Sequence, residues 1–106
     1  TPDWLSPHAL VVPVDYATFC SADVARNADL FLVDDRDQFL ANRDAGQFDG
    51  YPEPAAMLGE AILADTPRPP GQVVVTHLGV GLADVIFAAA ILERAADGGP
   101  GRLLPR

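Results

Sequence analysis

Two polar residues with useful chemistry directly follow apolar, β-branched stretches of the sequence: Asp15 follows one and His77 another. A carboxylate at the end of a buried strand can accept and release a proton beside a bound ligand, and histidine titrates near neutral pH. Each residue also has a plainer interpretation. Asp15 can cap the turn before the next helix, together with Thr18 and Ser21, and His77 can hydrogen-bond only to backbone. The residues alone leave both questions open.

A glycine-rich turn, THLGVGLAD, contains His77. Gly79 and Gly81 match the first two positions of the dinucleotide fingerprint G-x-G-x-x-G, but the third position falls on Asp84. A carboxylate there suits the first turn of a helix and repels a pyrophosphate. We therefore predict a tight strand-to-helix turn, in which glycine lets a buried helix pack close to the sheet, and not a phosphate loop.

Several other residues have types that could contribute to a site. Asp34 and Asp35 stand before a predicted helix, so capping is the favoured role for this pair. Tyr16 and Phe19 can line a pocket or belong to the core. Cys20 is the only cysteine, which excludes an internal disulfide and predicts a buried thiol. With two histidines far apart in the sequence, we expect no metal site.

Composition narrows the classes of partner. The 106 residues carry a net charge of −8 and a pI near 4.3, so we expect neither nucleic acid nor membrane partners. All seven cationic side chains are arginine, which rules out a lysine Schiff base within the chain. The start lacks a signal-like pattern, and the apolar run Val85 to Leu92 is too short to cross a bilayer. A cytoplasmic location is the expectation.

The elements that must position these residues alternate between strands and helices. Three apolar runs without alternation predict strands covered on both faces, over Ala9–Val14, Leu30–Asp35 and Gln72–Thr76. Pro13 removes one ladder donor near the end of the first run. This pattern predicts an α/β fold: a three-layer half-Rossmann arrangement of three parallel strands with flanking helices.

Four helices are predicted between and after the strands. They cover residues 21–29 with Ser21 as N-cap, 36–46 ended by Gly46, 54–65 with Pro54 in the first turn, and 82–96. The last helix is apolar almost all round until Glu93, which predicts that it is mostly buried. Residues 1–96 form the predicted domain unit, and 97–106 a tail rich in helix breakers. Because a three-stranded parallel sheet leaves both edges open, we expect a part of a larger fold.

Long stretches of the sequence resemble one known family. DWLSPHALVVPVDYATFCSADVARNADLFLVDDRDQF, then MLGEAI, then VVVTHLGVGLADVIFAAAILERA, resemble the C-terminal part of the ornithine cyclodeaminase/mu-crystallin family. The resemblance covers roughly Asp3 to Ala96 and maps onto the second half of a Rossmann domain that holds NAD or NADP. In the strand order 3-2-1-4-5-6, the three predicted strands would be strands 4, 5 and 6, side by side in chain order.

The resemblance implies roles for particular residues. Asp15 corresponds to the family's catalytic aspartate, which exchanges a proton near the imine carbon of an amino or imino acid substrate. Val14, His77, Leu78 and Gly79 would contact the cofactor, and Tyr16 and His77 would line the substrate pocket. The implied activity is ornithine cyclodeamination to proline and ammonia, or amino-acid dehydrogenase or ketimine reductase chemistry. The family's substrate-binding lysine and arginine belong to its other lobe.

The resemblance also implies partners and leaves alternatives. The glycine fingerprint and most of the substrate lobe would come from a missing N-terminal half, in the same protein or a partner chain, and the full protein would be a homodimer. This chain alone would be inactive. One alternative is a non-catalytic module of the mu-crystallin type that binds a small ligand or serves assembly. Another is a free-standing domain of the response-regulator type, against which the strand count argues.

Overall fold

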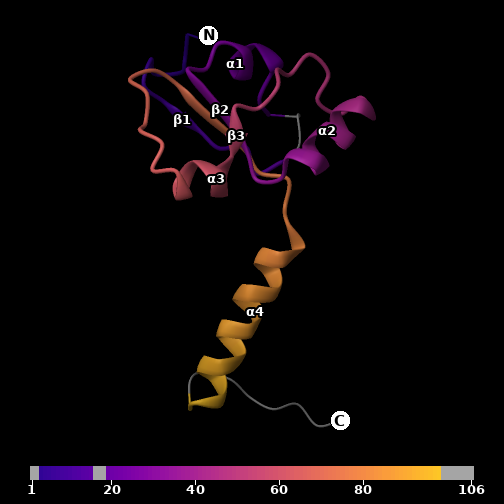
Figure 1. Cartoon of the computed structure of the whole chain (residues 1–106), viewed down its shortest axis with the longest axis vertical. Coiled ribbons are helices and arrows are strands. Elements are labelled where there is room, and N and C mark those ends of the chain that lie inside the picture. The colour runs from indigo at the N-terminus through magenta and orange to yellow at the C-terminus, as the bar shows by residue number, and fades with distance from the viewer. Residues whose placement is uncertain (1–2, 16–18, 99–106) are drawn as a thin grey trace.

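One all-parallel sheet forms the body of the protein, whose computed structural model describes residues 3–15 and 19–98 (Figure 1). Its strands are β1 (Leu10–Val11), β2 (Leu30–Val33), β3 (Ala56–Met57) and β4 (Val73–Thr76). The helices are α1 (Ala22–Arg26), α2 (Arg36–Asp44), α3 (Leu58–Leu63) and α4 (Gly81–Ala96). The predicted α/β class, with parallel strands and flanking helices, is confirmed. Tyr16 and the tail beyond residue 98 lie outside the described residues.

The number and order of the strands differ from the prediction. The sheet has four strands in the order β1-β4-β2-β3, so the last strand along the chain lies between the first two. The additional strand arises because Ala55 donates its N–H to the carbonyl of Phe31 at 2.8 Å, and Ala56 then pairs with Leu32. The helix expected from Pro54 therefore begins only at Leu58.

The strand order explains which face each helix covers. The chain passes from β1 over β4 to β2, continues in the same direction to β3, and then returns to β4. Right-handed crossovers place helices on one face while the chain moves in one direction and on the other face when it reverses. Accordingly, α1 and α2 contribute to one core cluster, and Ala61 of α3 packs against Leu32, Val73 and Val75 on the opposite face.

An aromatic cluster forms the centre of the core beneath α2. Phe39 projects from α2 and is fully buried, with its ring centroid 5.0 Å from that of Phe48 and 5.6 Å from that of Phe31. Tyr51 completes the cluster at 5.3 Å from Phe48. Tilted and edge-to-face arrangements at these separations add to the stabilisation from burial. The cluster fixes α2 over β2 and so fixes the residues at the end of that strand.

Helix termini follow the sequence signals in part. Asp35 caps α2, because its carboxylate accepts the N–H of Gln38 at 2.8 Å. Gly46, just past α2, has φ of +88°, as expected for a residue that ends a helix in the left-handed conformation. Ser21 occupies the N-cap position of α1, but its side chain makes no capping hydrogen bond.

Helix α4 contradicts the expectation that it is buried. It extends away from the sheet (Figure 1), and none of its residues is buried. Its large apolar side chains are 59 to 71% exposed: Leu82, Val85, Ile86, Phe87, Ile91 and Leu92. An apolar sequence shows that a helix favours being covered, but does not specify which surface covers it. Within the described part of the chain, no helix is long and apolar enough to cross a membrane.

The contrast between the core and α4 predicts opposite outcomes for two phenylalanine substitutions. Phe39→Ala should lower the free energy of unfolding by about 3–5 kcal/mol, because it empties a fully buried site. Phe87→Ala, the matched control on exposed α4, should change it by less than about 0.5 kcal/mol. Urea denaturation followed by circular dichroism measures both. Similar losses in the two variants would show that α4 packs within the chain.

Candidate functional site

A pocket of about 200 Å³ joins the residues that follow β1 to those that follow β4. Val14 and Asp15 line it from the β1 side, and His77, Leu78 and Gly79 from the β4 side. Both strands run in the same direction, so their carboxyl ends meet at one edge of the sheet. Ligands of open parallel sheets bind at this edge. The structure therefore brings together Asp15 and the four residues that the sequence predicted to contact a cofactor.

The corrected strand order brings the two halves of the pocket together. Neighbouring strands lie about 4.8 Å apart, so strands separated by one intervening strand lie about 10 Å apart. In the predicted order, β2 would have separated Asp15 from His77. Because β4 pairs directly with β1, with Val11 opposite Val74, the two chain segments leave the sheet side by side.

Asp34 holds the β4 side of the pocket in place. This residue follows β2, and its Oδ2 accepts the N–H of Leu78 at 2.9 Å and of Gly79 at 3.1 Å. Its Oδ1 accepts the N–H of Asp35 at 2.9 Å. The side chain is only 14% exposed. Hydrogen bonds from backbone N–H groups to a carboxylate are stronger than those between neutral groups, so this contact fixes the turn.

Capping was the favoured role for both members of the acidic pair, and the structure divides their roles. Asp35 caps α2, whereas Asp34 binds the turn after β4. Sequence reasoning missed this second role. The sequence contained a signal for this role, because Asp34 comes directly after one parallel strand and the turn with Leu78 and Gly79 comes directly after another. Residues at these two positions face the same edge of the sheet.

His77 lies in a compact set of contacts at the same turn. Its Nδ1 accepts the N–H of Gly79 at 2.9 Å and lies 3.4 Å from Oδ2 of Asp34. Its side chain is 54% exposed. Leu78 points inward and is buried in the main core cluster. The turn thus anchors itself through Leu78 and presents the imidazole at the surface of the pocket.

The remaining predicted residues fall in different places. Val14 is exposed, and Asp15 is partly buried. Phe19 does not line the pocket; its ring packs edge-on against Trp4, with centroids 6.2 Å apart. Tyr16, predicted for the substrate pocket, and Thr18, a possible capping partner of Asp15, lie outside the described residues.

Glycine has a different role in the turn from the one predicted. Gly79 has φ of +83°, a conformation that disfavours a side chain. Gly81 opens α4, and a Cβ added there would meet nothing within 4 Å. The prediction that glycine lets a buried helix approach the sheet is therefore wrong, because α4 leaves the sheet. Asp84 lies in the first turn of α4, where its charge disfavours a phosphate.

Cys20 and Tyr51 form a buried pair behind the pocket. The hydroxyl of Tyr51 donates to the carbonyl oxygen of Cys20. Burial raises the pKa of the Cys20 thiol. A hydrogen bond with Tyr51 lowers this pKa in part, and the negative charge of Asp15 raises it again. Burial also raises the pKa of Tyr51, and a negative charge on Cys20 or Asp15 would raise it further. The predicted buried thiol is confirmed, and these shifts keep it protonated.

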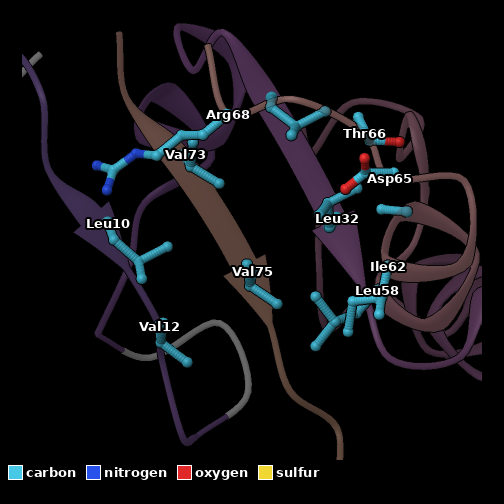
Figure 2. Close-up of a pocket in the computed structure, with 12 residues that line it drawn as sticks. Leu10, Val12, Leu32, Leu58, Ile62, Asp65, Thr66, Arg68, Val73 and Val75 are labelled. Atoms are coloured by element: carbon cyan, nitrogen blue, oxygen red, sulfur yellow. The ribbon is translucent and has the colours of Figure 1, made fainter. Parts of the chain in front are cut away.

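A second, larger hollow lies on the face of the sheet that α3 partly covers. It has a volume of about 540 Å³ and is floored by apolar side chains of β1, β4 and β2, as Figure 2 shows for Leu10, Val73 and Leu32. Leu58 and Ile62 of α3 form one wall. The hollow contains neither Asp15 nor His77. Its apolar floor is a sheet face that α3 covers only in part, so the strands are not covered on both faces as predicted.

Comparison with known proteins adds no family: neither the models of protein families nor the curated proteins match this chain. Among residues 3–15 and 19–98, no three histidine, cysteine, aspartate or glutamate side chains are grouped as metal ligands would be. The fold defines an α/β protein with a parallel sheet and a small pocket at its carboxyl edge, lined by Asp15, His77 and three uncharged residues.

The conformation of the turn predicts different effects for two neighbouring glycines. Gly79→Ala should lower the free energy of unfolding by about 1 kcal/mol, because alanine is strained at positive φ. Gly81→Ala should cause no loss, since Gly81 begins a helix in open space. Urea denaturation of both variants and the parent measures the difference. Equal stability of the two variants would contradict the left-handed conformation of Gly79.

Proposed function

We propose that this chain supplies the nicotinamide end of an NAD(P)-dependent enzyme that acts on amino or imino acids, as in ornithine cyclodeaminase. The observation that carries the proposal is the pocket, where Asp15 meets His77, Leu78 and Gly79 at the carboxyl edge of a parallel sheet. This is the edge at which parallel α/β folds bind cofactors. The resemblance of the sequence to that family, which implied roles for these residues, also supports the proposal.

The location of Asp15 in the pocket supports a role in proton transfer. A bound NAD(P) cofactor would supply hydride transfer between its nicotinamide and Cα of the amino or imino acid. Loss of the N–H proton from the substrate and addition of water or an internal amine to the imine both need a proton acceptor. The partly buried carboxylate of Asp15 supplies it.

The β4 side of the pocket would orient the cofactor. His77 is half exposed at the pocket surface, so its ring can contact the nicotinamide or a substrate carboxylate. Leu78 and Gly79 are held by Asp34, which gives the turn a fixed shape before any ligand binds. A pre-organised turn reduces the entropy cost of binding.

The phosphates of the dinucleotide would be bound by further polypeptide, from the same protein or a partner chain. Asp84 at the start of α4 disfavours phosphate there. Strand β1 pairs with β4 alone among the described strands, so its other edge can receive a strand that carries a glycine-rich loop.

The exposed apolar surface also favours further polypeptide. Six large apolar side chains of α4 are more than half exposed, and α3 covers the apolar face of the sheet only in part. The exposed side chains of α4 and the open sheet face are the two surfaces that such a partner would cover. A homodimeric, cytoplasmic enzyme remains part of this proposal.

The chemical role of Asp15 predicts a separation of binding from turnover. In the protein assembled with its dinucleotide-binding partner segment, Asp15→Asn should lower turnover of amino or imino acid by roughly 10²- to 10⁴-fold, because the proton acceptor is lost. NADH binding should persist. Asp49→Asn, on an exposed loop away from the pocket, is the matched control and should leave both unchanged. Release of ammonia follows cyclodeamination, which forms no net NADH, and absorbance at the reduced nicotinamide band follows dehydrogenase or ketimine reductase turnover. NADH fluorescence follows binding.

Two results would count against the proposal. Micromolar binding of NADH by the 106-residue chain alone would show that the phosphates are held within it. Unchanged turnover in Asp15→Asn would remove the role of Asp15. If the assembled protein bound small ligands but turned over no amino or imino acid, with or without the substitution, a binding module of the mu-crystallin type would be favoured.

A further inference from the structure

We infer that Asp34 is a positioning residue that, together with Gly79, keeps Nε2 of His77 a hydrogen-bond donor whether the ring is neutral or protonated. The ligand atom that meets His77 must then be an acceptor, such as a carboxylate or carboxamide oxygen. The statement about the ligand deepens the proposed function and rests on it. The assignment of the ring nitrogens rests only on the contacts around His77.

The neutral ring is assigned by its contact with Gly79. The N–H of Gly79 lies 2.9 Å from Nδ1, which is the normal length of an N–H···N or N–H···O hydrogen bond. A backbone N–H can only donate, so Nδ1 must be the unprotonated nitrogen. The hydrogen of the neutral ring is therefore on Nε2. The 3.4 Å separation between Nδ1 and Oδ2 of Asp34 is too long for a competing strong hydrogen bond.

The protonated ring carries a hydrogen on both nitrogens, so Nε2 is then a donor in any surroundings, and the contacts decide only what Nδ1 meets. When Nδ1 also carries a hydrogen, it repels the N–H of Gly79 and is attracted to the carboxylate of Asp34 at 3.4 Å. The N–H of Gly79 still has Oδ2 of Asp34 as an acceptor at 3.1 Å. Nδ1 thus has a partner in either state, and Nε2 carries a hydrogen in either state.

Asp34 makes this possible because it places Gly79 relative to the ring. The carboxylate binds the N–H groups of both Leu78 and Gly79, and it is shielded from solvent. The charged or titratable side chains that face His77 are Asp34 by direct contact and Asp15 across the pocket. No other ionisable side chain of the described residues lines the pocket.

The roles of the two polar groups in the pocket are thereby separated. His77 presents a donor, so it orients a ligand and does not accept a proton through Nε2. Asp15 is then the one side chain lining the described pocket that can accept a proton there. A ligand with an acidic or carbonyl oxygen toward His77 and its reacting atoms toward Asp15 satisfies both groups.

The test uses nuclear magnetic resonance of the 106-residue chain labelled with ¹⁵N and without any ligand. Long-range ¹H–¹⁵N spectra, recorded where the rings are neutral, report which ring nitrogen carries hydrogen. His8 is an internal reference of the opposite type, because its Nδ1 faces the carbonyl oxygen of Pro70 and must donate. The expected result is hydrogen on Nε2 in His77 and on Nδ1 in His8.

Two substitutions test the part played by Asp34. In the parent, a ¹⁵N–¹⁵N coupling through the hydrogen bond should join the amide of Gly79 to Nδ1 of His77. Asp34→Ala should abolish this coupling and speed hydrogen exchange of the Leu78 amide by about tenfold or more, because the charged acceptor is lost. Asp34→Asn, which keeps an acceptor oxygen, should retain the coupling. An unchanged His8 signal in each variant shows that the fold is intact.

Hydrogen on Nδ1 of neutral His77, or a full coupling in Asp34→Ala, would overturn the inference. If Asp34→Ala fails to fold, the tautomer in the parent still tests the assignment of the ring nitrogens, and loss of the coupling in Asp34→Asn would still contradict the part played by Asp34. Because no dinucleotide, substrate or turnover enters the experiment, its outcome is independent of the proposed enzymatic function. Loss of turnover in Asp15→Asn tests that function separately.

Discussion

The pairing of β4 between β1 and β2 is the constraint on which the rest of the structure depends. Val74 lies opposite Val11 on one side and Phe31 on the other, so β4 is hydrogen-bonded along both edges. The carboxyl ends of these three parallel strands face one edge of the sheet, and the segment after each strand supplies one part of the site. Asp15 follows β1, His77 follows β4, and Asp34 follows β2 and holds the turn after β4. A different order of the same strands would separate these groups.

The two faces of the sheet differ in how far they are covered. The aromatic cluster under α2 closes one face, and α3 covers only part of the other. Helix α4 leaves the sheet with its apolar side chains exposed, and the sheet face beside α3 is also apolar and open. Burial of apolar area at about 25 cal/mol per Å² would strongly stabilise an assembly that covered both surfaces. This asymmetry supports the proposal that the chain functions with further polypeptide.

The sequence predicted the local elements well because their signals are local. Runs of valine and leucine mark β2 and β4, and Asp35 marks the start of α2. Strand order was not predictable in the same way, because it depends on contacts between residues more than 40 positions apart, such as Leu30 and Val73. The two residues of β3, Ala56 and Met57, carry no strand signal, and pairing beside β2 overrides the helical pattern around them.

The candidate site was predictable in its members and not in its internal contacts. Asp15 and His77 are visible as polar residues at strand ends, and parallel strands place such residues at one edge. The role of Asp34 depends on the distance between two strand ends, which only the fold supplies. The exposure of α4 was missed because hydrophobicity does not identify the covering surface.

The shared pocket requires β4 to be the strand beside β1. Nuclear Overhauser effects between backbone protons test this most directly, because they show which strand neighbours β1. Contacts between Val11 and Val74 are expected, because these residues are paired in adjacent strands. Contacts between Val11 and Phe31, with none to Val74, would mean that β2 separates Asp15 from His77. That result would contradict the pocket and the roles derived from it.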